Sequence, residues 1–225
     1  MTVDLPASVW ATAQTHVRQQ RVGRYVAESA RHPGRMLPAI ARAAVAAYTA
    51  PGDLVVDPMC GVGTTLVEAL HLGRDALGVE YEPEWAEIAR ANLEHAAAQG
   101  ATGHGEVITG DARRLAELLD ALTAILASCR DLLRAGGVAV VTARPYRRGG
   151  ELVDLPAAVL RCGDAAGLVP YERNVALLAG LRGDGLVPRA SFFALDQVRR
   201  ARRAGRPLQV IAHEDVLVFR RPAAK

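Results

Sequence analysis

Several residue types are scarce in this 225-residue sequence, and each scarcity excludes a class of protein. Aromatic residues make up only 4% of the chain, so the core has to be built from aliphatic side chains. The three cysteines, Cys60, Cys129 and Cys162, lie far apart, and an odd number without a CxxC pair argues against a disulfide framework and against a zinc site. Scattered thiols are typical of a reducing compartment, so we expect a cytoplasmic protein.

Long apolar runs and lysine are scarce as well. No stretch of about 18 consecutive apolar residues occurs, so no membrane-spanning helix is expected. Residues 1–10 lack a basic segment followed by an apolar one, so we expect no secretory signal there. Lysine occurs only at Lys225, so 26 of the 27 basic residues behind the net charge of +3 are arginines. This mild basic excess permits a nucleic-acid partner without requiring one.

The sequence does contain a regular alternation of strand and helix patterns. Strands are predicted at residues 54–57, 76–80, 106–111, 138–142, 174–178 and 216–219, and helices at residues 38–48, 64–72, 84–98, 115–133, 155–166 and 196–203. This order predicts an α/β fold with a doubly wound, mostly parallel sheet, helices on both faces and an antiparallel C-terminal edge. We expect a lead-in over residues 1–30 and a single domain over residues 31–225.

The loop after the first predicted strand is the most informative segment. It lies where a strand ends and a helix begins, which is where doubly wound sheets bind ligands. Gly61 and Gly63 let the backbone turn tightly and let a cofactor approach it, although a tight turn alone would also explain them. A dinucleotide-binding loop would need a third glycine where this chain has Leu66, so a nicotinamide enzyme is disfavoured.

The whole loop, Asp57-Pro58-Met59-Cys60-Gly61-Val62-Gly63-Thr64-Thr65, resembles the D-P-x-x-G-x-G-T-T motif of the amino-methyltransferases. Members of that family transfer a methyl group from S-adenosylmethionine to exocyclic nitrogens of cytosine, adenine or guanine in DNA or RNA. The resemblance implies a Rossmann-like methyltransferase fold with S-adenosylmethionine as the cofactor. It also extends to His32 and Pro33, which open a segment that lies against the methionine part of the cofactor in the family.

Two further segments resemble cofactor motifs of the same family. Glu80, followed by Tyr81, stands where the family has an acidic residue that bonds both ribose hydroxyls, 19 positions after Gly61. Asp111, followed by Ala112, stands where the family has an aspartate that meets the adenine amino group. Taken alone, Glu80 could be a solvated strand-end acid, Asp111 a helix N-cap and His32 a surface histidine.

The catalytic motif of the family, [DNS]-P-P-[YFW], is missing. The dipeptide Pro-Pro does not occur, and residues 112–135 show a helical pattern that leaves no room for a fourth strand and its loop. We therefore predict no catalytic residue and expect strand four to be absent. Three explanations stay open: a degenerate relative that binds cofactor without methylating, an internally shortened product, or a segment omitted near Leu118-Leu119-Asp120.

Other candidates for chemistry are weaker. Pro145-Tyr146 follows a strand in the order of the missing motif, but the cation of Arg144 cannot accept a bond from an amino group. Cys60 is better explained as a loop-filling thiol than as a nucleophile. The adjacent residues His213-Glu214-Asp215 predict a turn rather than a metal site.

Two clusters of basic residues are candidates for contact with a nucleic acid. They comprise Arg147 and Arg148 beside the expected site and, in the late helix, Arg199, Arg200, Arg202, Arg203 and Arg206. Phosphate contacts and a solvated helix face are competing interpretations. The sequence therefore predicts either a base amino-methyltransferase or an S-adenosylmethionine-binding homologue that lost its catalytic loop, and it leaves DNA or RNA, the target base and the oligomeric state open.

Overall fold

A computed structural model describes residues 7–110, 118–148, 151–183, 185–189, 192–206 and 208–222. The chain forms two compact units, one of residues 15–118 and one that joins the residues up to 14 to those from 119 onward. Each unit has its own sheet and its own hydrophobic cluster. The expected division into a lead-in and a single domain after residue 30 stays a prediction.

The unit of residues 15–118 contains a three-stranded parallel sheet in the order β2-β3-β4. The strands are β2 (Leu54–Asp57), β3 (Asp75–Glu80) and β4 (Gly105–Thr109). In register, Asp57 lies opposite Gly78, and Glu80 lies opposite Thr109. The first three predicted strands are confirmed, and the carboxyl ends of β2 and β3 meet at one edge.

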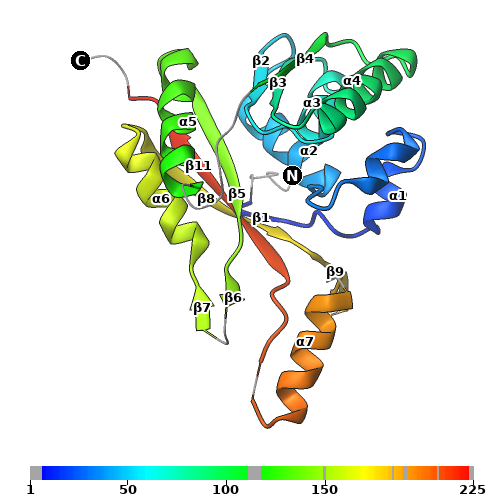
Figure 1. Cartoon of the computed structure of the whole chain (residues 1–225), viewed down its shortest axis with the longest axis vertical. Helices are drawn as coiled ribbons and strands as arrows, with labels where there is room; N and C mark the ends of the chain where they lie inside the picture. Colours follow the sequence, from blue (N-terminus) through cyan, green and yellow to red (C-terminus); the bar gives the residue numbers. More distant parts are fainter. Residues whose placement is uncertain are drawn as a thin grey trace, which may run out of the picture. The chain divides into compact units, whose positions relative to one another are not determined.

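The helices of this unit follow the predicted order, with a lead-in that packs onto them. They are α1 (Val17–Arg21), the 3-10 helix η1 (Ala27–Arg31), α2 (Pro38–Tyr48), α3 (Thr64–His71) and α4 (Pro83–Ala98). Figure 1 shows α3 and α4 beside the sheet. Leu66, Leu70 and Leu93 of these helices pack in one buried cluster with Ala76 and Val107 of the strands.

The second unit contains a four-stranded sheet in the order β1-β8-β11-β5. Its strands are β1 (Val9–Trp10), β5 (Val138–Ala143), β8 (Val169–Leu177) and β11 (His213–Arg220). β11 runs antiparallel to both of its neighbours, which confirms the antiparallel arrangement of the tail strands.

The prediction of a turn at His213-Glu214-Asp215 is wrong. These three residues begin β11 and pair with β8, where His213 lies opposite Leu177. The polar side chains suggested a turn, but pairing along β8 satisfies the backbone and extends the strand.

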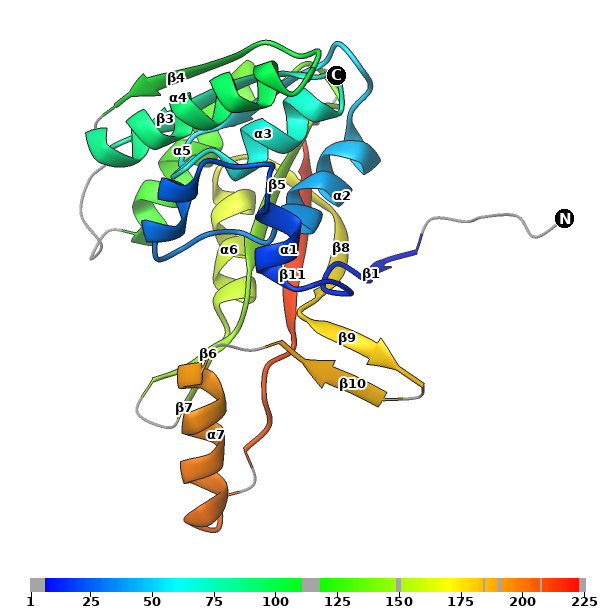
Figure 2. The ribbon, with the colours of Figure 1, turned by 90° about the vertical axis from the view of Figure 1, so that its right-hand side faces the viewer.

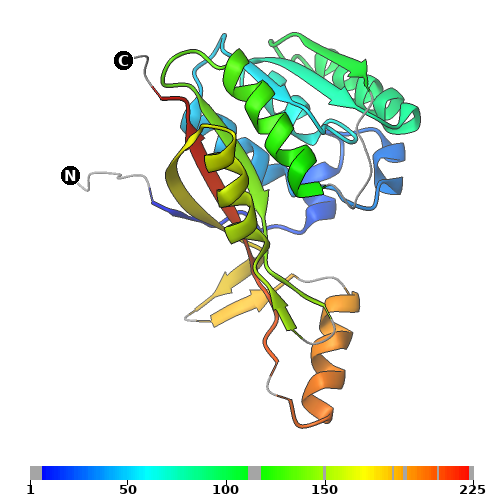
Figure 3. The same ribbon diagram turned by 60° about the vertical axis from the view of Figure 1, so that its left-hand side comes forward.

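Helices α5 (Leu118–Leu132) and α6 (Leu155–Ala165) cover one face of this sheet, as Figure 3 shows. Leu122 and Leu126 of α5 and Val159 of α6 are buried in one cluster with Leu217 and Phe219 of β11. Among the described residues no strand lies between β4 and α5, and α5 is one continuous helix from Leu118. The three explanations for the missing strand stay open.

The second unit also carries two hairpins and a basic helix, visible in Figure 2. One hairpin pairs β6 (Tyr146–Arg148) with β7 (Glu151–Val153), and the other pairs β9 (Ala179–Arg182) with β10 (Gly185–Pro188). The basic helix is α7 (Phe192–Arg203). The helix was expected at residues 196–203, whereas the four short strands were not predicted. No helix in the described part of the chain is both long enough and apolar enough to cross a membrane.

Candidate cofactor site

The loop between β2 and α3 is shaped by two glycines in the left-handed conformation. Gly61 has φ +54° and Gly63 has φ +76°. A Cβ atom on Gly61 would lie 3.3 Å from the His32 ring, and one on Gly63 would lie 3.3 Å from the Cβ of Ala89. Both positions therefore favour glycine through backbone conformation and through close approach.

Asp57, the last residue of β2, turns its carboxylate into this loop. Its Oδ1 accepts a hydrogen bond from the Met59 N–H at 3.1 Å, and the Thr65 side chain bonds to it as well. Burial raises the pKa of Asp57, although these two bonds oppose the rise. The carboxylate thus helps to hold the shape of the loop, while its contact with the cofactor stays a prediction.

Glu80, the last residue of β3, connects the loops that follow two neighbouring strands. Its Oε2 accepts the Gly61 N–H at 2.8 Å, and its Oε1 accepts the Glu82 N–H at 3.0 Å. Because a carboxylate has about four acceptor sites, two of them remain for other donors. This capacity fits a pair of hydroxyl groups such as those of a ribose.

His32 lies against the same loop. Its ring packs edge to face on Trp85, with 4.9 Å between the ring centroids, and its Nδ1 accepts the Gly34 N–H at 3.2 Å. Burial lowers the pKa of His32, and the charge of Glu80 opposes the decrease. The structure therefore brings His32, Gly61 and Glu80 together, as the sequence motifs predict.

For the remaining predicted residues with described positions, the structure gives their exposure but no contact with His32, Gly61 or Glu80. Pro33, Met59 and Tyr81 are exposed, and Pro58 is half-buried at the start of the loop. Asp111 and Ala112 lie outside the described residues.

Cys60 is buried in the loop, at 6% exposure. Burial raises the pKa of its thiol to about 12. A Cβ on Gly78 of β3 would lie 2.8 Å from the Cys60 sulfur, so the absence of a side chain at Gly78 makes room for the thiol. A thiol with such a high pKa is a packing group rather than a nucleophile at neutral pH.

Asn92 in α4 is a supporting residue that sequence reasoning missed. It is fully buried, and its Nδ2 donates to the Val62 carbonyl oxygen at 2.8 Å and to Ser29 Oγ at 2.7 Å. Its Oδ1 accepts the Val26 N–H at 2.8 Å. The sequence could have indicated this role, because Asn92 is a polar residue on the apolar face of the helix predicted at residues 84–98.

Glu68 in α3 was missed too. It is fully buried and accepts hydrogen bonds from Arg24, Arg42 and the Tyr25 hydroxyl. Burial would raise the pKa of Glu68, but these bonds outweigh it and hold the pKa below its ordinary value. The cluster fixes the lead-in and α2 to the helix that starts at the loop.

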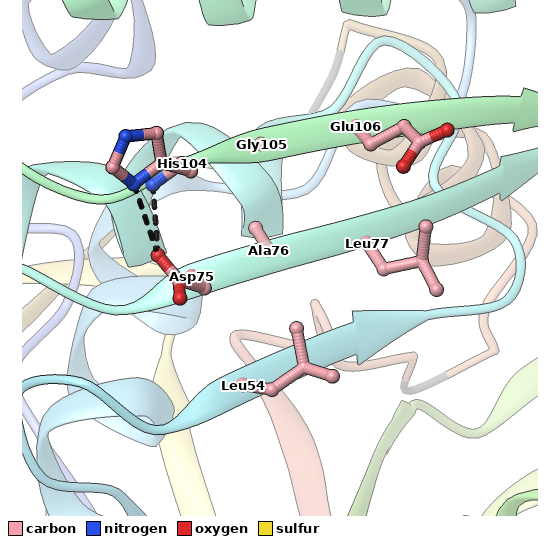
Figure 4. A pocket seen from close by; sticks show the side chains of 7 residues that line it. All are labelled: Leu54, Asp75, Ala76, Leu77, His104, Gly105 and Glu106. Carbon is pink, nitrogen blue, oxygen red and sulfur yellow. Dashed lines mark hydrogen bonds and ion pairs between the residues drawn. The ribbon is translucent and has the colours of Figure 1, made fainter.

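A pocket of about 390 Å³ lies elsewhere on this unit, at the amino ends of the strands (Figure 4). It is lined by Leu54, Asp75, Ala76, Leu77, His104, Gly105 and Glu106. Asp75 Oδ1 accepts the backbone N–H of His104 at 2.9 Å, as the dashed lines in Figure 4 indicate. Since none of the predicted site residues lines it, this pocket is distinct from the loop at the carboxyl ends.

The basic clusters belong to the second unit. Arg147 in β6 is exposed, and Arg148 ends the same strand. The other members are exposed on and just after α7, and they are Arg199, Arg200, Arg202, Arg203 and Arg206. Arg200 forms an ion pair with Asp196 at 2.7 Å. No group of three or more potential metal ligands was found among the residues with described placement.

Comparison with known sequences matches the part of the chain that carries the loop. A family model of the N6/N4 methyltransferase type, described as DNA methylase, matches residues 4–91. A tRNA (guanine(10)-N2)-dimethyltransferase of Methanothermobacter thermautotrophicus is 39% identical over 94 residues, which are 40% of this chain and 27% of that protein. The type II methyltransferase M2.DpnII of Streptococcus pneumoniae is 39% identical over 64 residues, which are 28% of this chain and 24% of that protein. The matched segments thus span less than a third of these relatives.

Solved structures extend the likeness in fold to most of the chain. TrmN from Thermus thermophilus superposes with a TM-score of 0.54 at 17% identity, over 92% of this chain and 52% of that one. A Methanobacterium thermoautotrophicum protein described as precorrin 8w decarboxylase gives the same TM-score over 87% of this chain and 96% of that one, also at 17% identity. The motifs, the geometry around Gly61 and the matching family model agree on one likeness: residues 4–91 are similar to the S-adenosylmethionine-dependent amino-methyltransferases.

Proposed function

We propose that this chain binds S-adenosylmethionine at the loop of residues 57–65 and methylates an amino nitrogen of a base in DNA or RNA. The observation that carries the proposal is the meeting of His32, Gly61 and Glu80 around one loop. All three lie in the unit of residues 15–118 and occupy positions that resemble cofactor motifs of the family.

The residues of the loop fit the chemistry of this cofactor. Glu80 keeps two acceptor sites for the ribose hydroxyls after bonding Gly61 and Glu82. The first N–H groups of α3 provide donors for an anionic group. His32 and Pro33 would lie against the methionine part, and Asp111 and Ala112 would meet the adenine. When bound, S-adenosylmethionine supplies a methyl group activated by its sulfonium charge, and transfer needs positioning more than a strong base.

A nucleic-acid substrate is supported by the relatives and by charge. The matched relatives are named for tRNA guanine and for a type II methyltransferase. We propose that Arg147, Arg148 and the arginines of residues 199–206 contact phosphates, since clustered guanidinium groups bind them well. A cytoplasmic location agrees with such a substrate and with the scattered cysteines.

A second candidate function is cofactor binding without catalysis. It is favoured by one specific observation, the absence of the [DNS]-P-P-[YFW] motif from a sequence that contains no Pro-Pro at all. Without that motif the chain lacks the acceptor and the aromatic ring that hold the target base in the family. The two candidates share the cofactor site and differ only in methyl transfer.

Two measurements test the proposals. Titration calorimetry with S-adenosylhomocysteine should show binding to the full chain, and no binding would overturn both candidates. Incubation with S-adenosylmethionine labelled in the methyl group, with mixed DNA and tRNA, then separates them. Incorporation above that of a Glu80→Ala control supports the enzyme, whereas binding without incorporation supports the cofactor-binding homologue.

A further inference from the structure

The hairpin of β9 and β10, which Figure 2 shows, exposes two leucines on one of its faces. Leu181 and Leu186 lie directly opposite each other in the antiparallel register, so their side chains share that face. They are 56% and 52% exposed. Ala179, two positions before Leu181 and therefore on the same face, is fully buried. The apolar face thus runs from a buried base to an exposed end.

The other face of the hairpin is cationic. Arg182 lies on it and is exposed. A Cβ on Gly180 would lie 3.2 Å from Nη2 of Arg189, so this second guanidinium lies against the same face. Val187, which pairs with Gly180, is an exposed apolar residue there. The two strands therefore separate an apolar face from a cationic one.

The base of the hairpin is held by Gln14. Its side-chain Nε2 donates to the Ala179 carbonyl oxygen at 3.4 Å, and its Oε1 accepts the Leu181 N–H at 3.2 Å. Its backbone carbonyl oxygen accepts a hydrogen bond from Nη2 of Arg189 at 2.8 Å. Because the hairpin is anchored in this way, its exposed leucines are already oriented before a partner binds, which lowers the entropy cost of binding.

The charge of the surrounding segment indicates the kind of partner. Residues 179–206, which contain the hairpin and α7, include seven arginines and two aspartates, a net charge of +5, whereas the whole chain carries +3. A second copy of this chain would place these like charges against one another. A nucleic acid would instead neutralise them through its phosphates.

The exposed leucines restrict the form of that nucleic acid. A duplex presents phosphates, sugars and base edges to its surroundings, while the flat faces of its bases are stacked inside. Leucine is among the apolar side chains that proteins insert between bases, at the cost of unstacking them. This cost is smallest where the bases are already unpaired.

We propose that the face of Leu181 and Leu186 packs on unstacked bases of a nucleic acid, while Arg182 and the arginines of α7 contact its phosphates. The hairpin thereby favours a strand whose bases are locally unpaired over a perfect duplex. The proposal deepens the proposed function and rests on its nucleic-acid substrate, because an enzyme that acts on a base has to reach that base outside the stack.

Two labelled duplexes of equal length test this preference on the full chain by fluorescence anisotropy. One is perfectly paired and the other has central mismatches, so they carry the same phosphates and differ in base stacking. Each is made in DNA and in RNA, and the preference is expected in the nucleic acid that binds more tightly. The mismatched duplex should bind about 10-fold more tightly, as expected from burying the exposed part of two leucine side chains. Equal affinity for the two duplexes would overturn the proposal.

A double variant, Leu181→Thr with Leu186→Thr, then locates the effect. Threonine suits a strand but removes most of the apolar surface. This variant should lose most of the mismatch preference, while its affinity for the perfect duplex stays within about twofold because the arginines remain. Val187→Thr is the matched control, since it replaces an exposed apolar residue on the cationic face, and it should retain the preference.

The remaining outcomes each decide for or against the hairpin. Equal weakening of both duplexes by the double variant, or failure of the unmodified protein to bind either duplex, would contradict the proposal. Self-association that the double variant abolishes in sedimentation would show that the face joins two copies of the chain. If the double variant does not fold, Leu186→Thr alone should reduce the preference partly, and a full preference there would count against the assignment.

These results are independent of the cofactor measurements. A mismatch preference in a chain that does not bind S-adenosylhomocysteine would support the hairpin and reject the proposed methyl transfer. Binding of S-adenosylhomocysteine without any mismatch preference would reject the hairpin and leave the cofactor site standing.

Discussion

Glu80 illustrates how much a single side chain contributes to the proposed site. It bonds Gly61 and Glu82 through its two oxygens and retains acceptor capacity for the cofactor. Replacing it by alanine should weaken S-adenosylhomocysteine binding by about 1–3 kcal/mol, the cost of leaving such donors unpaired. Calorimetry checks this value against Glu82→Ala, which removes an exposed neighbouring acid and should bind normally. Unchanged affinity of the Glu80 variant would reject the ribose assignment.

Glu68 gives a prediction about acid stability. Its pKa is lower in the folded chain than in the unfolded chain, so its carboxylate contributes stability above the ordinary value of about 4.3. This contribution is lost as the pH falls through the lower folded value. Glu68→Gln should cost about 1–3 kcal/mol at pH 7, because the partly exposed Arg24 and Arg42 lose the buried carboxylate that accepts their hydrogen bonds.

Urea unfolding at pH 7 and at several acidic pH values checks this prediction. The Glu68→Gln variant should lose less further stability in acid than the unmodified protein. Glu87→Gln is the control, since Glu87 is 73% exposed in its pair with Arg90 and should change stability little. Equal stability of the Glu68 variant and the unmodified protein at pH 7 would show that the cluster is not stabilising.

Residues that form the glycine loop could be predicted from the sequence, whereas those that support it could not. The loop motif is contiguous, and Glu80 follows at a fixed spacing. Asn92 and Glu68 act through contacts between distant segments, with 30 positions from Asn92 to Val62 and 44 from Glu68 to Arg24. Such partners depend on packing, which a local pattern does not contain.

At the scale of elements, the loop conformation itself can be tested. Gly63→Ala combines left-handed strain, worth about 1–2 kcal/mol, with a contact of 3.3 Å to Ala89. Gly52→Ala has the same kind of strain at φ +86° but open space around it. Both variants should be destabilised in thermal unfolding, and only Gly63→Ala should also weaken S-adenosylhomocysteine binding. If both variants bind S-adenosylhomocysteine equally well, the loop tolerates the shift that a side chain at position 63 imposes.

The contact between α6 and β11 is equally specific. A Cβ on Gly163 would lie 2.2 Å from the Phe219 ring, so the helix can approach the strand closely only with glycine there. Gly163→Ala should destabilise the protein by about 1–3 kcal/mol through overpacking. Chemical denaturation, with Ala158→Gly as a control that leaves the contact open, would show whether the approach is as close as described. A Gly163→Ala variant of unchanged stability would contradict it.

Long elements were predicted better than short ones, for a physical reason. Amphipathic helices such as α4 and buried strands such as β3 repeat their pattern over several residues. The strands β6, β7, β9 and β10 have three or four residues each, too few to show a period. The turn expected at His213 failed because tertiary pairing with β8 overrode local polarity.

At the scale of the whole molecule, ligand binding should protect one unit selectively. Every proposed cofactor residue with a described position lies in the unit of residues 15–118. Hydrogen exchange with and without S-adenosylhomocysteine should therefore show the largest gain of protection around residues 57–65 and 78–82. The strands β8 and β11 serve as the internal control. Protection confined to those strands would place the ligand elsewhere.

The order of elements along the chain was predictable, but the division into two units was not. The unit boundary between Leu118 and Leu119 falls within the stretch of residues 112–135, which was predicted as continuous helix. Which strands pair, and hence where one sheet ends and another begins, depends on contacts between distant segments that local sequence patterns do not contain. The domain expected over residues 31–225 stays a prediction.

Asn92 has a consequence for genetics. It lies in α4, yet it fixes the carbonyl of Val62 and the lead-in at Val26 and Ser29. In a random mutagenesis screen for loss of cofactor binding, substitutions at Asn92 should score alongside those at Gly61 and Gly63. A map of such hits onto the sequence would show a cluster in α4, and the contact of Asn92 with Val62 would assign that cluster to the glycine loop rather than to a separate binding site.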